Sequence, residues 1–269
     1  MKKKLSIFLC VLFFSLSSFE SNKNIIGKSS KMFVGYQKEN PVFDSSDEKT
    51  LYVLKNEKLE LLTKYSVNYS VRIVKDNYIC YSEKTKAGTN IVVSISGKER
   101  KIPIISKFTY VTINNDGTIY YTDLKQSNSI KEISSNSQPK LTGISGYIIT
   151  CLEGYLYYSK EHDENIESAN ADIFKYDLKT KKTKRILINV AGEGTIIFPD
   201  QNYIFDEILT GGEYKPILYS VKDKKYTLLP KKYAGAPYYS YQKKCLIYYD
   251  DDGKEIEKLE IPRKFTISR

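Results

Sequence analysis

The amino-acid sequence predicts an all-β protein, and three observations support this prediction. The chain holds 24 tyrosines and 11 phenylalanines, no tryptophan and two methionines, a composition that favours strands over helices. No stretch keeps a sustained helical periodicity of apolar residues. Short β-prone runs separated by turn signals recur along the 269 residues at a spacing of about 40. Four short strands at that spacing are typical of one blade of a β-propeller.

The clearest repeat unit spans residues 145–187. Its first two strands are separated by the turn signal Glu153-Gly154, and a long polar loop, 160–172, follows the second strand. The basic turn 179–182 separates the last two strands. We expect the four strands at 147–150, 156–159, 173–178 and 183–187.

Degraded copies of this unit occur before and after it. Each copy has a second-strand anchor, for which we take as equivalent Val34, Cys80, Tyr120, Tyr157, Ile204 and Tyr248. The intervals between these anchors are 46, 40, 37, 47 and 44 residues. A third strand follows each anchor, at 51–54, 91–95, 130–133, 173–178, 217–221 and 256–259. The two coupled series predict six four-stranded blades, although any Tyr-rich β protein also contains paired tyrosines.

The run G-Y-L-Y-Y-S at 154–159, followed by I-F-K-Y-D-L-K-T-K-K at 173–182, resembles a known group of repeats. These are the Tyr-rich repeats of TolB-like six-bladed β-propellers, which are bacterial secreted or envelope proteins. The resemblance covers the chain from about residue 31 to its end. It implies a toroid of blades that binds or scaffolds, and it carries over no catalytic residue, since fold does not dictate function.

The first 21 residues have the pattern of a secretory signal peptide. Three lysines at 2–4 precede an apolar run at 5–19, and the sequence turns polar from Asn22. The apolar run is short for a membrane span, although an uncleaved N-terminal anchor remains the alternative. We therefore expect a secreted or extracytoplasmic protein whose residues 22–269 form a single propeller domain.

The two ends of this domain should close the ring. The innermost strand of blade one is expected near 24–28, and 264–268 should supply the outer strand of blade six. Both faces of a blade pack against neighbouring blades, so both members of an aromatic pair on one strand can be buried. We expect at least one buried member in each of the pairs Tyr120-Tyr121, Tyr157-Tyr158 and Tyr248-Tyr249.

Cysteine and histidine contents argue against a metal site. Cys80, Cys151 and Cys245 remain after removal of the signal segment, and we interpret them as core residues with at most one disulfide. There is no C-x-x-C motif, and His162 is the one histidine, so zinc is disfavoured. His162 lies in a polar loop, where a solvated residue is expected. We predict no catalytic residue, no cofactor and no metal, and interpret 250–253 as a hairpin turn.

Charge divides between two sets of loops. The net charge is +10, and loss of residues 1–21 leaves +8. The turns between third and fourth strands are basic. Their candidate contacts with an anionic surface are Lys179, Lys181, Lys182, Lys224 and Lys225. The loops between second and third strands are longer and more acidic. Their candidate binding residues are Asp44, Asp47, Glu161, His162, Asp163, Glu164, Asp206, Glu207, Glu213 and Tyr214.

Two classes of function fit these patterns. The favoured one is a non-catalytic, secreted or envelope-associated propeller that binds a protein, peptide or glycan through its long loops. The alternative is a secreted polysaccharide hydrolase or lyase, which a carboxylate or tyrosine cluster facing the central channel would support. Weak association with an anionic envelope or membrane surface is a further expectation. Nucleic acid is a disfavoured partner, because wall polymers or lipid surfaces fit the positive charge equally well.

Overall fold

The structure is a computed structural model in which the part of the chain that can be described is entirely β. It describes residues 31–38, 40–56, 58–86, 88–104, 108–134, 138–162, 171–192, 195–198, 201–229, 238–240, 245–249, 255–262, 265 and 267–268. These residues form strands and no helix, and so contain no helix able to span a membrane. The all-β prediction is confirmed, whereas the predicted signal segment, 1–21, lies outside the described residues.

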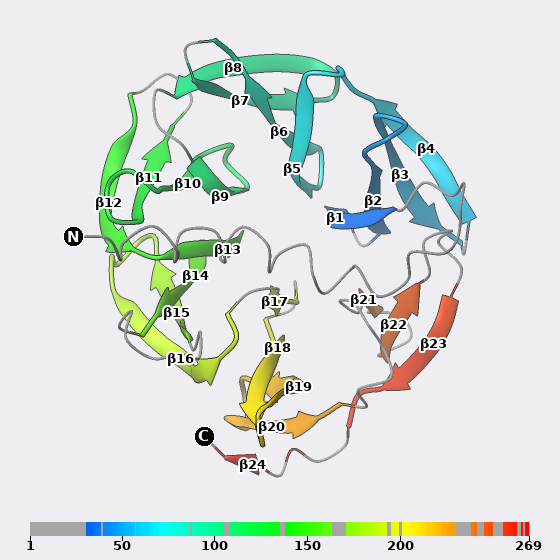
Figure 1. Cartoon of the computed structure of the whole chain (residues 1–269), viewed down its shortest axis with the longest axis vertical. Helices are drawn as coiled ribbons and strands as arrows, with labels where there is room; N and C mark the ends of the chain where they lie inside the picture. The colour runs from blue at the N-terminus through cyan, green and yellow to red at the C-terminus, as the bar shows by residue number, and fades with distance from the viewer. Residues whose placement is uncertain are drawn as a thin grey trace, which may run out of the picture.

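The strands form five sheets arranged around a common centre (Figure 1). The first sheet consists of two antiparallel meanders, which we call meanders 1 and 2. Meander 1 contains β1 (Met32–Gln37), β2 (Asn40–Ser45), β3 (Thr50–Lys55) and β4 (Lys58–Lys64). Meander 2 contains β5 (Tyr69–Lys75), β6 (Tyr78–Lys84), β7 (Thr89–Ile95) and β8 (Lys98–Ile104). Their innermost strands, β1 and β5, pair in parallel and join the two meanders.

The other four sheets are meanders 3 to 6. Meander 3 contains β9 (Phe108–Ile113), β10 (Ile119–Asp123), β11 (Ser129–Ile133) and β12 (Lys140–Ser145). Meander 4 contains β13 (Tyr147–Leu152), β14 (Tyr155–Glu161), β15 (Ala171–Asp177) and β16 (Thr183–Val190). Meander 5 contains β17 (Ile196–Ile197), β18 (Tyr203–Thr210), β19 (Glu213–Ser220), β20 (Lys225–Leu228) and β24 (Ile267–Ser268). Meander 6 contains β21 (Tyr238–Ser240), β22 (Cys245–Tyr249) and β23 (Glu255–Glu260).

Each meander runs from the centre of the ring to its rim (Figure 1). Because successive strands alternate in direction, the links between meanders and the loops between second and third strands lie on one side of the ring. We call this side the connector face. The turns between first and second strands, and between third and fourth strands, lie on the other side, which we call the turn face.

The apolar core lies between consecutive meanders. Five clusters of buried side chains each join one meander to the next, from the pair 1–2 through to the pair 5–6. Tyr157 packs in the cluster between meanders 4 and 5, while its neighbour Tyr158 packs in the cluster between meanders 3 and 4. This opposite orientation is expected for adjacent residues on one strand. Burial is confirmed for Tyr120, Tyr121, Tyr157, Tyr158 and Tyr248.

The three cysteines are buried, as expected of core residues, and no disulfide links them in the described part of the chain. Burial raises the pKa of the Cys80 and Cys151 thiols to about 12. Thiols with such a pKa stay protonated at neutral pH, so they act as small apolar side chains.

Two predictions about the ends of the fold are wrong. Val34 lies in the innermost strand β1 rather than in a second strand, so β1 takes the place expected for 24–28, and Val42 in β2 is the true anchor. At the other end, β24 pairs with β20 of meander 5 instead of completing meander 6. Phe265, two residues before β24, stacks its ring on Tyr203 of meander 5 at a centroid distance of 5.8 Å, which agrees with this placement.

Candidate ligand-binding surfaces

A small polar residue recurs two positions after the second-strand anchor. In five meanders this position is buried and is occupied by Asp44, Ser82, Thr122, Ser159 and Asp206. In meander 3, Thr122 Oγ1 donates a hydrogen bond to the carbonyl of Gly146 at 2.9 Å and accepts one from the amide of Ile148 at 3.2 Å. Thr122 therefore joins its strand to the link that enters the next meander.

Two of the predicted loop acids serve this same purpose. The Tyr65 hydroxyl, in the link between meanders 1 and 2, donates to Asp44 Oδ1 at 2.6 Å. Burial raises the pKa of Asp44, although this hydrogen bond and nearby Lys49 oppose the rise. Asp206 accepts bonds from Thr195 Oγ1 and from the amide of Gly192, both in the link between meanders 4 and 5. Because both carboxyls are buried against their own chain, they position the connector face rather than present charge on it.

His162 forms an ion-pair geometry that the sequence analysis did not predict. Its Nε2 lies 2.8 Å from Asp172 Oδ1, and Arg185 Nη1 donates to Asp172 Oδ2 at 3.0 Å. The amide of Asn189 adds a bond to Asp172 Oδ1 at 3.1 Å. Burial alone would raise the pKa of Asp172, but the bonds from Asn189, His162 and Arg185 outweigh it, and the net shift is downward. His162 is exposed, as expected of a solvated residue, and its Nε2 in addition contacts the buried carboxylate of Asp172.

The loop between the second and third strands of meander 5 is an extended hairpin. Strands β18 and β19 pair over their full eight residues, and Gly211 and Gly212 form the tip with φ of +63° and +80°. Leu209 and Tyr214 are cross-strand partners beside the tip, with exposures of 36% and 37%. The hairpin thus presents an apolar pair on a regular, fully paired scaffold.

The structure separates the predicted loop residues into two groups. Asp44 and the exposed Asp47 belong to meander 1, which lies across the ring from meanders 4 and 5 (Figure 1). The other described residues come from meanders 4 and 5, whose link is held by a bond from the amide of Ala191 to the carbonyl of Glu207. This second group comprises Glu161, His162, Asp206, Glu207, Glu213 and Tyr214. Asp163 and Glu164 lie outside the described residues.

The five predicted surface lysines lie in the turns that end the third strands of meanders 4 and 5. Lys179, Lys181 and Lys182 surround the turn after β15, where Asp177 accepts the amides of Lys179 and Thr180. These backbone bonds, that from Thr180 above all, lower the pKa of Asp177. In meander 5, Lys224 lies in the turn after β19, and Lys225 is the first residue of β20. Among the residues that can be described, none of the five side chains forms an ion pair.

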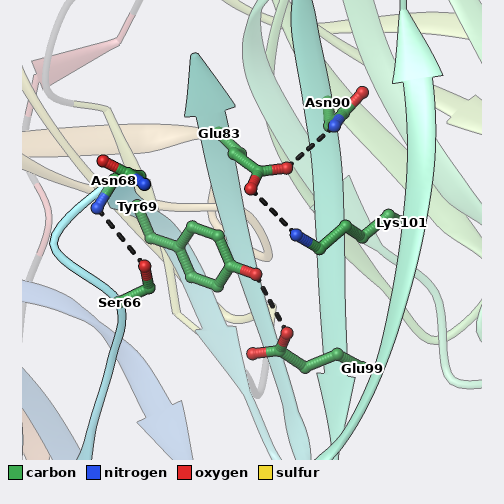
Figure 2. Close-up of polar contacts among 7 residues, drawn as sticks. All are labelled: Ser66, Asn68, Tyr69, Glu83, Asn90, Glu99 and Lys101. Carbon is green, nitrogen blue, oxygen red and sulfur yellow. Dashed lines mark hydrogen bonds and ion pairs between the residues drawn. The ribbon is translucent and has the colours of Figure 1, made fainter. Parts of the chain in front are cut away.

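In meander 2, a polar row crosses the sheet rather than gathering in a loop (Figure 2). Glu83 on β6 accepts bonds from Asn90 Nδ2 and Lys101 Nζ, both at 2.8 Å. Nearby, the Tyr69 hydroxyl donates to Glu99 Oε2 at 2.9 Å. The Glu83–Asn90 bond joins the neighbouring strands β6 and β7, whereas Lys101 and Glu99 reach from β8 to β6 and β5. Every charged group drawn has a partner, so we interpret the row as structural.

The innermost strands contain features that sequence reasoning missed. Strands β1, β5, β9 and β13 each have a β-bulge where they pair with the second strand. In β5 and β9 the extra residues are Arg72 and Tyr110, and both have exposed side chains. Bulges re-aim side chains and are common next to functional sites. The available signal was a single cation, Arg72, inside an otherwise β-prone run.

Comparisons with known proteins identify the fold but no family. Neither a family model nor a curated protein matches this sequence. Among solved structures, TolB from Acinetobacter baumannii is 14% identical with a TM-score of 0.56, over 86% of this chain and 64% of that one. The oligogalacturonate lyase of Vibrio parahaemolyticus is 9% identical with a TM-score of 0.57, over 89% of this chain and 80% of its own.

The putative TolB of Agrobacterium tumefaciens is also similar, with 12% identity and a TM-score of 0.53, over 74% of this chain and 79% of that one. This chain spans about two thirds of the A. baumannii protein. At such low identities, the structural similarity shows the fold alone. This fold is an all-β arrangement of the propeller type. No group of three or more His, Cys, Asp or Glu residues in the described ranges is placed to hold a metal ion.

Proposed function

We propose that the protein is an exported, six-bladed β-propeller that binds a protein, peptide or glycan on its connector face. The six meanders supply the blades. Each of the five core clusters covers one meander with the next, so a sixth contact, between meanders 6 and 1, would cover the two remaining faces and close the ring. Export follows from the predicted signal peptide at 1–21.

The observation that carries the binding proposal is the β18–β19 hairpin. Its exposed Leu209 and Tyr214 lie side by side, and an aromatic side chain on a rigid strand gives contact area at low entropic cost. Glu161 and Glu213 are also exposed in meanders 4 and 5 and add negative charge to this side of the ring. A partner that combines an apolar patch with basic groups would match this surface.

Screening defined peptide and glycan libraries with residues 22–269 tests the binding proposal. A double variant, Leu209→Ser with Tyr214→Ser, should lose the ligands that the unchanged protein selects. Leu228→Ser is a matched control, because Leu228 is also exposed but lies on the outer strand β20 of the same meander. If the double variant keeps the same ligands with the same affinity, the hairpin is not the contact surface.

The alternative function, a polysaccharide hydrolase or lyase, has one specific observation in its favour. The contact of His162 with Asp172 is the arrangement that orients a histidine for proton transfer, and Arg185 lies on the same carboxylate. An enzyme of this kind would release new reducing ends from an acidic or neutral polysaccharide, and His162→Ala should abolish the release. Undiminished release in that variant would exclude His162 from the chemistry.

The turn face has a separate role in this proposal. Its lysines, among them Lys181, Lys182 and Lys224, would attract the exported protein to an anionic envelope or membrane surface. The connector face then points away from that surface and is free for the specific partner.

A further inference from the structure

An arginine on the innermost strand of meander 2 is exposed where its neighbours are buried. Val71 and Val74 of β5 belong to the core cluster shared with meander 1, whereas Arg72 between them is exposed. Arg72 is the extra residue of the bulge, because Val71 pairs with Tyr81 and the next pair is Ile73 with Cys80. Strand β5 lies nearest the centre in its meander (Figure 1), and its pairing with β1 is confined to Val74 and Lys75, so the pairing ends before Arg72.

One end of the Arg72 guanidinium is fixed by the protein. Its Nε donates a 2.8 Å hydrogen bond to Oγ of Ser82, a buried residue of the adjacent strand β6. The two Nη groups have no hydrogen-bond or ion-pair partner in the described parts of the chain. Burial lowers the pKa of Arg72, and the buried thiol Cys80 is the one titratable group that opposes this effect. The group is thus a partly desolvated cation without a carboxylate.

The neighbouring innermost strand presents an aromatic ring at the corresponding bulge. Tyr110 of β9 has a φ of +56°, a conformation that costs free energy for a bulky residue, and is 45% exposed. Its ring lies edge-on to Tyr147 of β13 at a centroid distance of 5.3 Å. Asn128 Nδ2 donates to the Tyr147 hydroxyl at 3.0 Å and fixes that second ring. The strained backbone is therefore associated with an exposed, supported aromatic side chain.

A second cation lies at the opposite end of the same strands. Lys75, the last residue of β5, donates to the carbonyls of Ile113 in β9 and Cys151 in β13. The ammonium therefore spans the turn-face ends of three innermost strands. Arg72 lies three residues closer to the connector face, from which a ligand would approach along the ring axis.

We propose that the axial side of β5 and β9 is a carboxylate-binding site, in which the two Nη groups of Arg72 grip the carboxylate and the Tyr110 ring flanks the group that bears it. A guanidinium anchored through Nε presents Nη1 and Nη2 as a fork, which matches the two oxygens of a carboxylate. The carboxylate would belong to a sugar acid or to a peptide C-terminus. This site is distinct from the β18–β19 hairpin and does not depend on the function proposed above.

Calorimetric titration of residues 22–269 at low salt tests the site. The probes are glucuronate and trialanine, with glucose and trialanine amide as counterparts that lack a carboxylate. At least one acid should bind, its counterpart without the carboxylate should bind at least about tenfold more weakly, and the acid that binds identifies the source of the carboxylate. Failure of both acids to bind at about 10 mM would overturn the proposal.

Variants locate the site. Arg72→Gln should weaken binding of the acid at least about tenfold, and Arg72→Lys should weaken it less, because an ammonium keeps the charge but not the fork. Arg100→Gln is the matched control, since Arg100 lies on the outer strand β8 of the same meander. This variant should bind the acid with the affinity of the unchanged protein. If Arg72→Gln does not fold, Arg72→Lys carries the test. Wild-type affinity in the folded Arg72 variant would refute the assignment.

Discussion

Thr195 Oγ1 donates a 2.6 Å hydrogen bond to Oδ2 of Asp206, a carboxyl group that is 1% exposed. The amides of Gly192 and Glu207 donate to the other oxygen at 3.3 and 2.7 Å. Thr195 and Gly192 lie in the link from meander 4, and Asp206 lies in the second strand of meander 5. One buried carboxyl therefore holds the connector between two meanders.

This carboxyl predicts a pH dependence of stability. Burial, the largest effect, raises the pKa of Asp206 from 3.8 to about 7 in the folded protein, despite the bonds from Thr195, Glu207 and Gly192. Between these values the folded state binds more protons than the unfolded state, so the free energy of unfolding falls as pH rises from about 4 to about 7. The slope from this group is at most about 1.4 kcal/mol per pH unit.

Thermal unfolding across this pH range should separate Asp206→Asn from the unchanged protein. The variant cannot titrate at this position, so it should gain stability relative to the unchanged protein as pH rises. Asp47→Asn is the control, because Asp47 is an exposed acid in meander 1 and its loss should leave the profile unchanged. Parallel profiles for Asp206→Asn and the unchanged protein would show that the carboxyl titrates normally.

The paired tyrosines of β14 should each be essential to stability. Tyr157 and Tyr158 are 3% and 4% exposed and pack on opposite sides of meander 4. Replacement of either by Ala should lower the free energy of unfolding by roughly 3–5 kcal/mol, as for other large-to-small core changes. Tyr214→Ala at the exposed hairpin should change it by less than about 0.5 kcal/mol. Denaturant titration would contradict the packing if both β14 variants matched Tyr214→Ala.

Gly35 allows the parallel contact between meanders 1 and 2. A Cβ at this position would lie 1.9 Å from the carbonyl oxygen of Val74 on β5. Gly35→Ala should therefore force β1 and β5 apart and destabilise the fold by at least about 1–3 kcal/mol. Gly97→Ala is a matched control, since Gly97 also has a positive φ, +81°, but no atom lies within 4 Å of the added Cβ. Equal losses in the two variants would indicate backbone strain rather than a clash.

Charge reversal tests the proposed role of the turn face. Replacement of Lys181, Lys182, Lys224 and Lys225 by Glu should reduce retention on anionic liposomes at low salt, because several weak attractions act together. Salt screens such contacts over about 10 Å at 0.1 M, so retention of the unchanged protein should fall as salt is added. Circular dichroism should show an intact fold, since Lys181, Lys182 and Lys224 lie in turns and Lys225 lies at the end of a strand. Equal retention of the two proteins would leave the lysines without this role.

The sequence predicted those parts of the fold that depend on local pattern. The tyrosine pairs mark second strands because a strand buried on both faces needs apolar groups on both, as Tyr157 and Tyr158 show. The second strands of meanders 1, 2 and 5 lack a tyrosine pair, and in meander 1 the aromatic run from Phe33 to Tyr36 in the first strand has the pattern expected of an anchor. The C-terminal strand pairs with β20, and Phe265 just before it stacks on Tyr203; both contacts are long-range, and no local pattern contains them.

The candidate sites were less predictable than the fold. In the sequence, Asp44 and Asp206 look like ordinary residues of polar loops. Only their burial in the structure shows that they hold the links between meanders. The contact of His162 with Asp172 joins the two ends of a loop. The order of residues in the sequence does not show that these two ends lie close together. Arg72 becomes notable only once its bulge and its unpaired Nη groups are known.

The proposed function depends most on the closed ring of six blades. A crystal structure of residues 22–269 is the most direct test of this ring. We expect six sheets around one axis, with the strands of meander 6 packed against those of meander 1. A ring of five blades, an open arc, or two sheets packed face to face would contradict it.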